Sequence, residues 1–354
     1  MLYRECGNYK DTYARDMAIF PIPFDRWGLG VMLVLAFLVI PYVASNYWLS
    51  SIMIPFYCFS LAALGLNFLT GYAGQVSIGH AAFMAVGAYA SLILYGRYGI
   101  PLLPSILGGG IVSAAVGSVF GIPSLRIKGF YLAVSTLAAQ FIIEWVLTHW
   151  KWVSGGVFGT VDAPDLQIFG WIIDTPVKKY YLVLCIVVPL VLFGKNLVRG
   201  QLGRNWQAIR DMDVAAEIIG VSLFRYKLIA FAVSSFYAGV AGSMITLAYY
   251  GAANIEEFNL LVSFQILGMI IIGGMGTVLG SFFGAGFMVL LPIFINQTLL
   301  ALLGLETVPS DLRANIELII FGGLIVFFLI VEPYGMARLW HTIKDKMRLW
   351  PFPY

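Results

Sequence analysis

Ten long apolar windows, joined by polar stretches, limit what this chain of 354 residues can fold into. A helix of about 20 residues crosses the ~30 Å hydrocarbon core of a bilayer. Only 11% of the residues are charged, and a soluble domain with so few polar groups cannot cover its surface. The sequence therefore predicts an all-α, polytopic integral membrane protein. The windows lie at 28–47, 50–70, 80–96, 101–122, 129–149, 180–198, 227–249, 257–273, 277–300 and 316–332.

The predicted number of spans is nine or ten. The eighth window is short and the ninth follows it closely, so these two windows are compatible with two spans or with one broken helix. Basic residues are concentrated at 195–227 and in both chain ends, and such segments usually face the cytoplasm. Ten spans place all three segments on that side, whereas nine spans misplace one end. We therefore expect both termini in the cytoplasm.

This alternation divides the chain into a membrane domain and two polar tails. The first 27 residues lack the apolar core of a signal peptide, so the window that follows is expected to remain as an anchor. The loop at 150–179, expected outside, is either a solvated linker or a docking platform for something that arrives from outside. The expected parts are a cytoplasmic tail at 1–27, a transmembrane domain at 28–332 with a basic cytoplasmic loop at 199–227 and an outer loop at 150–179, and a cytoplasmic tail at 333–354.

Composition argues against several function classes. The formal net charge is +3, from 21 basic and 18 acidic residues, which gives no strongly basic face for nucleic acid. A phosphate loop of the G-x-x-x-x-G-K-[ST] type is absent from the sequence. We expect no catalytic residue, no metal and no cofactor on this chain, so any ATPase must be another polypeptide. The cysteines and histidines, which form neither a disulfide framework nor a metal-ligand spacing, are Cys6, Cys58, Cys185, His80, His149 and His341.

The stretch 71–83, GYAGQVSIGHAAF, interrupts the apolar pattern. Irregular backbone at membrane depth is tolerated only inside the protein or beside a cavity. Its polar side chains are therefore candidates for the path of a polar solute, and an ordinary cytoplasmic turn with glycines for close packing is the alternative. The three glycines and three polar residues are Gly71, Gly74, Gly79, Gln75, Ser77 and His80.

Glu144 is an acidic residue inside the window 129–149, with Gln140 one helical turn before it. A carboxylate near the bilayer centre costs roughly 2.5–3.5 kcal/mol on insertion scales, so it usually faces a bundle interior or water. Trp145 and Trp150 place Glu144 near the outer interface. Gln140 and Glu144 are both candidates for the solute path. For Glu144 we favour the alternative, an interfacial or interhelical hydrogen bond.

The stretch 271–285, IIGGMGTVLGSFFGA, contains glycines suited to close helix packing. Gly280 and Gly284 have the G-x-x-x-G spacing that lets two helix backbones approach each other. Gly273 and Gly276, together with the glycines of 71–83, complete the set that we expect to pack helices.

The basic loop contains a segment, 203–220, that is too polar to span a membrane but has helical periodicity. Asp213 is predicted to be an N-cap, and Gly220 is predicted to take the left-handed position after a helix end. The segment should form a short amphipathic helix and a turn. It lies either on the inner leaflet or in a groove of a cytoplasmic partner. Its marked residues are Arg204, Arg210, Asp213, Ala215, Ala216, Glu217 and Gly220.

Five motifs, taken in order, resemble the permeases of branched-chain amino acid ABC importers. The resemblance covers most of the chain, and it is closer to the LivM-type subunit than to its LivH-type partner. Tyr334 stands where an arginine is common, and the first 27 residues have no counterpart in the family's core. The motifs are 71–83, LRIKGFYLAVSTLA at 125–138, 203–220, IIGGMGTVLG at 271–280 and VEPYG at 331–335.

The resemblance implies a helical permease in a bacterial inner membrane that pairs with a second, LivH-like permease. Two cytoplasmic, LivG/LivF-like ATPase subunits, which use ATP and Mg, and a periplasmic solute-binding protein complete such importers. It also implies that Ala215-Ala216-Glu217 and Gly220 belong to the coupling loop in the ATPase cleft, and that 71–83 borders the translocation path. The expected function is ATP-driven import of branched-chain or related amino acids by alternating access.

Two other functions stay open. Permeases of this kind also carry urea, short amides or other amino acids, since the binding protein largely selects the cargo. The second alternative is a stand-alone secondary transporter or channel. That class uses ionisable residues buried near the midplane, and Glu144 is almost alone there.

Overall fold

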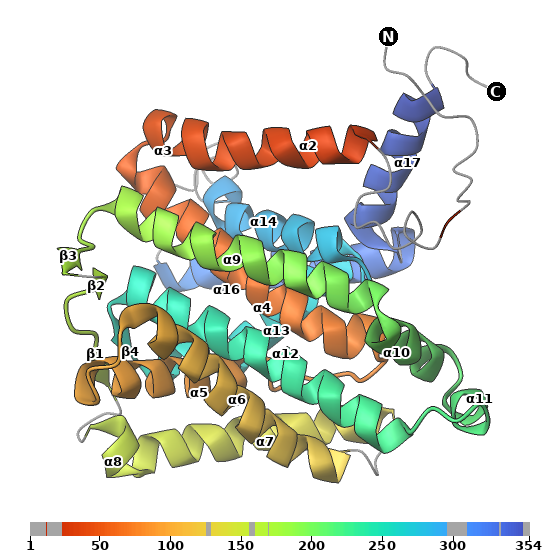
Figure 1. Cartoon of the computed structure of the whole chain (residues 1–354), viewed down its shortest axis with the longest axis horizontal. Helices are drawn as coiled ribbons and strands as arrows, with labels where there is room; N and C mark the ends of the chain where they lie inside the picture. Colours follow the sequence, from red (N-terminus) through yellow and green to blue (C-terminus); the bar gives the residue numbers. More distant parts are fainter. Residues whose placement is uncertain are drawn as a thin grey trace.

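The computed structural model describes residues 12, 23–124, 129–155, 160–168, 170–295, 310–332 and 334–349. Most of the predicted amino-terminal tail, the motif residues 125–128 and the last five residues lie outside this part of the chain. The described residues form a bundle of helices with two very short two-stranded sheets (Figure 1). The predicted all-α membrane fold is confirmed.

The helices follow the apolar windows. In the first half of the chain they are α2 (Pro23–Val34), η1 (Leu35–Val39), α3 (Ile40–Val43), η2 (Trp48–Met53), α4 (Ile54–Asn67), η3 (Phe68–Tyr72), α5 (His80–Leu92), η4 (Ile93–Arg97), α6 (Leu102–Ser124), α7 (Phe130–His149) and α8 (Lys151–Ser154). In the second half they are α9 (Pro176–Arg199), α10 (Gln201–Asp211), α11 (Asp213–Ile218), α12 (Leu223–Ile245), η6 (Thr246–Tyr250), η7 (Ile255–Phe258), α13 (Leu260–Gly273), α14 (Val278–Phe294), α16 (Ser310–Val331) and α17 (Gly335–Leu349).

The strands lie in two connections between helices. β1 (Val161–Asp162) pairs antiparallel with β4 (Ala252–Ala253). β2 (Gln167–Ile168) pairs antiparallel with β3 (Trp171–Ile172). The first pair joins segments that are far apart in the sequence, so it fixes the position of the outer loop.

The number of spans is lower than predicted. Among the described residues, seven helices are long and apolar enough to cross a membrane, or eight if the bent pair in α16 and α17 counts as one span. Each of the ten windows contains a helix. α14, with 17 residues, is apolar but too short to count as a candidate span, and the helix of α5 and η4 is not among the candidates either.

The eighth and ninth windows form a hairpin instead of one broken helix. α13 and α14 pack against each other, and a Cβ at Gly284 would overlap the carbonyl oxygen of Met269. A Cβ at Gly273 would overlap the backbone of Gly280 in the same way. Only glycine lets the two backbones approach so closely.

The core of the bundle is built around α12, which packs against α4, α5 and α6 (Figure 1). Small residues permit this packing: Gly239 of α12 lies against Gly87 of α5. The Ser243 hydroxyl donates a hydrogen bond to the Gly87 carbonyl oxygen at 2.9 Å. The helices α4, α5 and α6 are therefore held close to α12. Most residues of α5 are buried among its neighbours.

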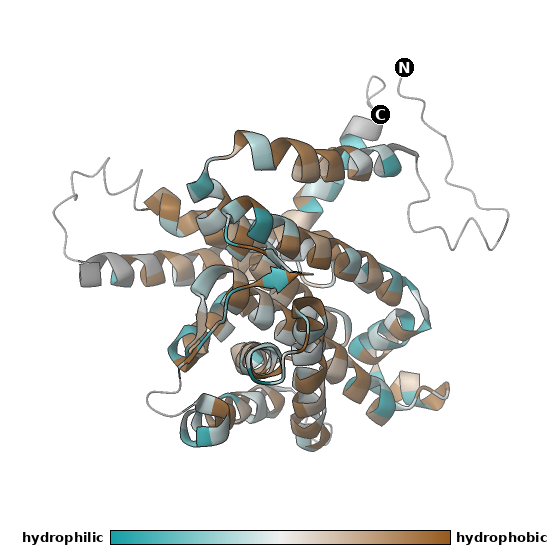
Figure 2. Ribbon diagram, turned by 60° about the vertical axis from the view of Figure 1, so that its left-hand side comes forward, coloured by the Kyte–Doolittle hydropathy of each residue, from teal (hydrophilic) through white to brown (hydrophobic). Residues whose placement is uncertain are grey.

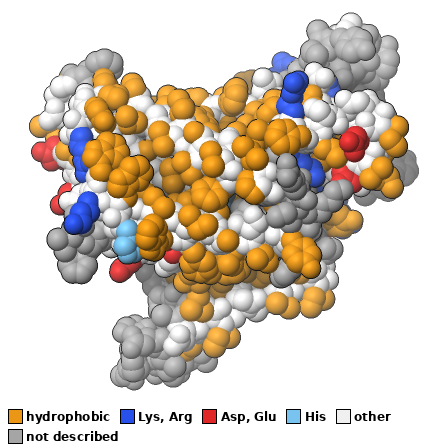
Figure 3. All heavy atoms as spheres, turned by 90° about the horizontal axis from the view of Figure 1, so that it is seen from below, with side chains coloured by type: hydrophobic (Ala, Val, Ile, Leu, Met, Phe, Trp, Pro, Cys, Tyr) orange, Lys and Arg blue, Asp and Glu red, His pale blue; other side chains and the backbone are white. Residues whose placement is uncertain are grey.

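Apolar side chains cover the outside of the bundle between two polar ends. Figure 2 shows hydrophobic residues along the helices and hydrophilic residues mainly at helix ends and connections. The face seen in Figure 3 has a broad apolar band, and its visible charged side chains lie near the two ends. On α7 the exposed side chains include Tyr131, Phe141, Ile142 and Trp145. Such a belt fits the hydrocarbon core of a bilayer.

Candidate functional site

The connections between helices gather at two opposite ends of the bundle (Figure 1). We call the first the α10 end, because it holds α10 and α11 together with the connections 73–79 and 274–277. Arg210 of α10 joins these parts, since its Nη1 donates a hydrogen bond to the Gly71 carbonyl oxygen at 2.9 Å. Segments from three distant regions of the sequence therefore meet at this end.

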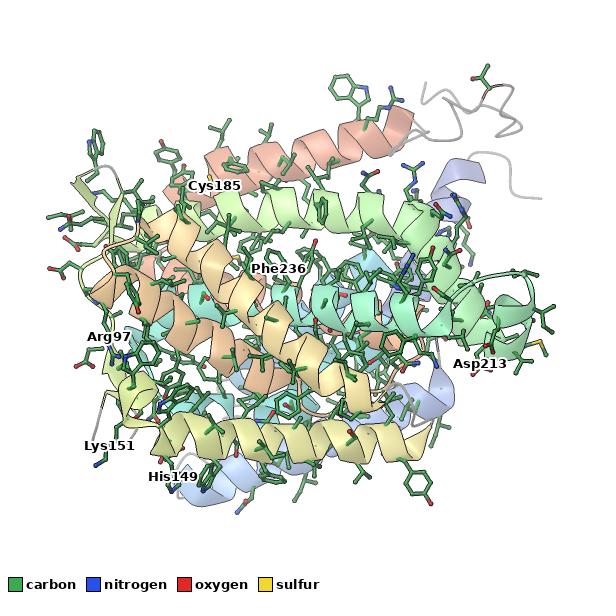
Figure 4. The ribbon with its side chains drawn as sticks, turned by 60° about the horizontal axis from the view of Figure 1, so that its bottom comes forward. Arg97, His149, Lys151, Cys185, Asp213 and Phe236 are labelled. Atoms are coloured by element: carbon green, nitrogen blue, oxygen red, sulfur yellow. The ribbon has the colours of Figure 1, made fainter. Side chains whose placement is uncertain are left out.

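We call the opposite end the β1 end, because the outer loop with β1 lies there. The Tyr95 hydroxyl, at the end of the α5–η4 helix, donates to the Asp165 carbonyl oxygen at 2.7 Å. The Arg97 guanidinium lies 5.8 Å from the ring centre of Trp152. Figure 4 shows Arg97 and Lys151 at this end and Asp213 at the other. The outer loop and the basic loop thus lie at opposite ends, as alternating spans require.

The basic loop forms two short helices, where the sequence predicted one. Trp206 of α10 is fully buried, and its Nε1 donates to the Tyr226 carbonyl oxygen at 2.9 Å. This contact anchors α10 to the bundle. α12 begins at Leu223, a few residues before the apolar window that starts at 227.

α11 projects from the α10 end. Gly220 has a φ of +91°, in the left-handed region that glycine adopts without strain. The prediction that Asp213 is the N-cap was wrong: Met212 is the N-cap, and its carbonyl accepts from the Ala216 amide at 3.0 Å. The apolar side chain of Ile218 is 81% exposed. A short helix with exposed apolar residues on a protruding loop is suited to a groove in a partner.

Arg210 lies between two glycine turns. Gly74 and Gly276 both have positive φ angles, +68° and +77°. A Cβ at Gly74 would lie 2.9 Å from Arg210 Cγ, and a Cβ at Gly276 would lie 3.3 Å from Arg210 Nη1. Arg210 also forms an ion pair with the neighbouring Asp211 at 2.9 Å. The glycines are therefore needed both for their backbone conformation and to make room for this arginine.

Asn67 is a site residue that the sequence reasoning missed. It is fully buried, and its Nδ2 donates to the Thr277 carbonyl oxygen at 2.7 Å and to Ser281 Oγ at 3.1 Å. Its Oδ1 accepts from the Gly276 amide at 2.8 Å. The side chain thus ties α4 to the α13–α14 turn. The available signal was an isolated amide inside an apolar window, which marks an interhelical contact.

The segment 73–79 is irregular, and its polar side chains point inward. Gln75, Ser77 and His80 are all buried. The amide of Ile78 donates to Thr136 Oγ1 on α7 at 3.0 Å. His80 Nε2 lies 3.0 Å from the carbonyl oxygen of Ala62 in the middle of α4. The segment therefore runs from the α10 end into the bundle, and α5 begins in the interior.

Gln140 connects three helices around the beginning of α5. Its Oε1 accepts from the Ala82 amide at 2.9 Å and from Ser263 Oγ at 3.1 Å. Its Nε2 donates to Glu144 Oε1 at 2.6 Å and to the Phe258 carbonyl oxygen at 2.8 Å. The amide of Gln140 thus has its partners inside the protein, and it holds the half-buried Glu144 on the same helix face.

The buried polar groups described above are suited to hydrogen bonding. Within the described part of the chain, His, Cys, Asp and Glu side chains form no group of three that could hold a metal ion. The predicted path has two polar parts, the segment with Gln75, Ser77 and His80 and the helix with Gln140. They meet at the beginning of α5, where the Ala82 amide donates to Gln140 Oε1. The structure keeps the α11 residues at a distance, at the end of the molecule.

The comparisons with known proteins identify the family. A family model described as the permease component of branched-chain amino acid transport systems matches residues 48–329. The chain belongs to this family. The resemblance inferred from the five motifs is confirmed, and so is the reading of the chain as a transport component. No solved structure matches this permease.

Its relatives include permease proteins of amino acid and sugar transport systems. The LivM permease of a high-affinity branched-chain amino acid transport system in Salmonella typhimurium is 30% identical over 302 residues, which cover 79% of this chain and 67% of that protein. A probable LivM permease of Methanocaldococcus jannaschii is 24% identical and covers 81% of this chain and 92% of its own length. The ribose import permease RbsC of Haemophilus influenzae is more distant, at 22% identity over 68% of this chain and 73% of its own.

Proposed function

We propose that this permease is the LivM-like transmembrane subunit of a binding-protein-dependent ABC importer, which carries branched-chain or related amino acids across a bacterial cytoplasmic membrane. The family and the names of the relatives support the cargo class. The apolar belt and the candidate spans support the location.

The partners in this proposal are a LivH-like permease, two LivG/LivF-like ATPase subunits that use ATP and Mg, and a periplasmic solute-binding protein. The sequence has no phosphate loop, so nucleotide is bound elsewhere. α11 offers the ATPase pair a protruding helix, with Ile218 and Ile219 exposed at 81% and 75%. The residues from Ala215 to Gly220 then form the coupling loop.

The proposed orientation places the α10 end and both termini in the cytoplasm and the β1 end in the periplasm. The most basic loop lies at the α10 end, which favours the cytoplasmic side. The outer loop, held by the β1–β4 pair, is then the surface that faces the binding protein.

The observation that carries the mechanism is the contact of Arg210 with Gly71. Gly71 lies just before the segment 73–79, which contains the buried Gln75 and Ser77. Nucleotide binding that displaces α10 and α11 therefore pulls on the segment beside the solute path. Such a device shifts the permease between two states only if nucleotide binds them with different affinity.

The test is uptake of labelled leucine by liposomes that contain the whole importer and ATP on the cytoplasmic side. We expect Arg210→Ala to lower leucine imported per ATP hydrolysed by roughly tenfold, the effect of losing one hydrogen bond from a charged group. Arg204→Ala is the matched control on the same helix, because the bond that Arg204 Nη1 makes within the described chain goes to the nearby Arg199 carbonyl oxygen, at 3.2 Å. Uptake that does not depend on ATP would contradict the importer function itself.

A further inference from the structure

Three side chains beside the amino-terminal end of α5 have hydrogen-bonding atoms that the protein leaves unused. Gln75, Ser77 and His80 are 7%, 0% and 1% exposed. Gln75 Oε1, Ser77 Oγ and His80 Nδ1 have no hydrogen-bond partner within the described chain. Each buried polar atom without a partner costs about 1–3 kcal/mol, and such atoms are rare enough in folded proteins to need an explanation.

The chemistry of the three groups indicates what they can bind. The Ala62 carbonyl can only accept a hydrogen bond, so His80 Nε2 carries the proton. His80 Nδ1 is therefore an acceptor in the neutral ring. The Ser77 hydroxyl and the Gln75 amide can each donate and accept. A ligand with both donors and acceptors, such as an ammonium group beside a carboxylate, satisfies this set, whereas an aliphatic side chain satisfies none of it.

The position of the three groups favours a ligand inside the membrane. The first turn of α5 is held in the bundle interior, since the Ala81 amide donates to Ser263 Oγ of α13 at 2.9 Å and the Ala82 amide to Gln140 of α7. These bonds occupy the Ala81 and Ala82 amides, so a ligand beside this helix end meets the unused atoms of the three side chains. Solute sites in membrane transporters are often formed where a helix is interrupted.

The segment also has an open side. Along 74–77 exposed and buried residues alternate: Gln75 and Ser77 are buried, while Gly74 and Val76 are exposed. Irregular backbone of this kind cannot face lipid, because its polar groups would lack partners there. The segment therefore lies between the bundle interior and either an aqueous path or another subunit.

We propose that Gln75, Ser77 and His80 form the subsite that receives the amino and carboxylate groups of the transported amino acid. The ammonium group lies toward Gln75 Oε1 and His80 Nδ1, which accept hydrogen bonds, and the carboxylate lies toward the Ser77 hydroxyl, which can donate one. This inference rests on the proposed function and adds the part of the solute that the site recognises. The aliphatic side chain of the solute then lies away from these three residues.

The first experiment measures ATP-driven leucine uptake by the complete importer in liposomes. We expect Ser77→Ala combined with Gln75→Met to lower uptake roughly tenfold or more, because hydrogen bonds to a charged ligand are lost. Ser105→Ala is the matched control, since its buried hydroxyl bonds the Leu102 carbonyl oxygen of its own helix at 2.7 Å, and it should transport normally. Unchanged uptake by the double variant overturns the subsite, while transport by the unsubstituted complex still upholds the proposed function.

The second experiment uses a nearly isosteric change, Ser77→Cys, in a protein in which Cys6 and Cys185 are replaced by serine. The full importer in nanodiscs is labelled with a small cationic methanethiosulfonate reagent. We expect leucine to slow the labelling and N-acetylleucine amide, which has the same side chain but no charges, to leave it unchanged. Equal protection by both compounds, or by neither, overturns the proposal.

Discussion

At the scale of single residues, buried amide side chains hold the helices of this permease in place. Asn67 makes two hydrogen bonds to the α13–α14 turn and one to Ser281 of α14, and Gln140 makes four bonds around the beginning of α5. Both connect residues more than 100 positions apart in the sequence, except for the Gln140 bonds to Ala82 and Glu144. Inside a membrane such bonds replace the hydrophobic force that water supplies elsewhere.

A substitution at Asn67 should therefore destabilise the fold. Asn67→Leu removes three hydrogen bonds, and we expect a loss of about 2–5 kcal/mol in the free energy of unfolding. Ser281→Ala removes one of the three, so its effect should be clearly smaller. Denaturant unfolding in detergent micelles measures both. Equal stability of Asn67→Leu and the unsubstituted protein would show that the amide does not connect the helices.

At the scale of elements, α11 depends on the turn that follows it. The Gly220 amide donates to the Glu217 carbonyl oxygen at 3.0 Å, and the Val221 amide donates to that of Ala216 at 2.9 Å. These bonds close the helix end and fix the angle at which α11 projects. Among the described residues, no atom lies within 4 Å of where a Cβ at Gly220 would be, so there is space for a side chain at this position.

Backbone strain at Gly220 should therefore disturb the ATPase contact and little else. We expect Gly220→Val to weaken co-purification of the ATPase subunits and to lower ATP hydrolysis severalfold, since a β-branched residue strains a positive φ. Gly99→Val is the matched control: Gly99 also has a positive φ, +65°, and open space around it, but it lies at the β1 end. Equal losses in the two variants would indicate general destabilisation and would contradict a special role of α11.

The sequence predicted these elements unevenly, for physical reasons. Hydropathy located a helix in each window, because burial in lipid requires an apolar helix of nearly fixed length. It could not show that α5 starts in the bundle interior, since Ser263 and Phe258, which hold that region, are distant in sequence. The error at Asp213 was one residue, a usual uncertainty for helix ends. Arg210 was singled out, but its partner Gly71 follows only from the tertiary structure.

At the scale of the whole molecule, the permease has two polar ends and an apolar belt between them. The α10 end holds the basic loop, and the β1 end holds the outer loop. A movement of α10 and α11 at the α10 end must be transmitted to the solute path, which lies between the two ends. The Arg210–Gly71 contact joins the α10 end to the segment 73–79. For this coupling to work, the two ends must face opposite sides of the membrane, with α11 inside the cell.

The most direct test is cysteine labelling in intact cells, with Cys6 and Cys185 replaced by serine. Ile218→Cys on α11 and Trp171→Cys on the outer loop are both at exposed positions, 81% and 79%. A membrane-impermeant maleimide should label Trp171→Cys from outside and should reach Ile218→Cys only after the membrane is opened. Labelling of Ile218→Cys in intact cells would place α11 outside, where no ATPase can bind it, and would contradict its role as the coupling helix.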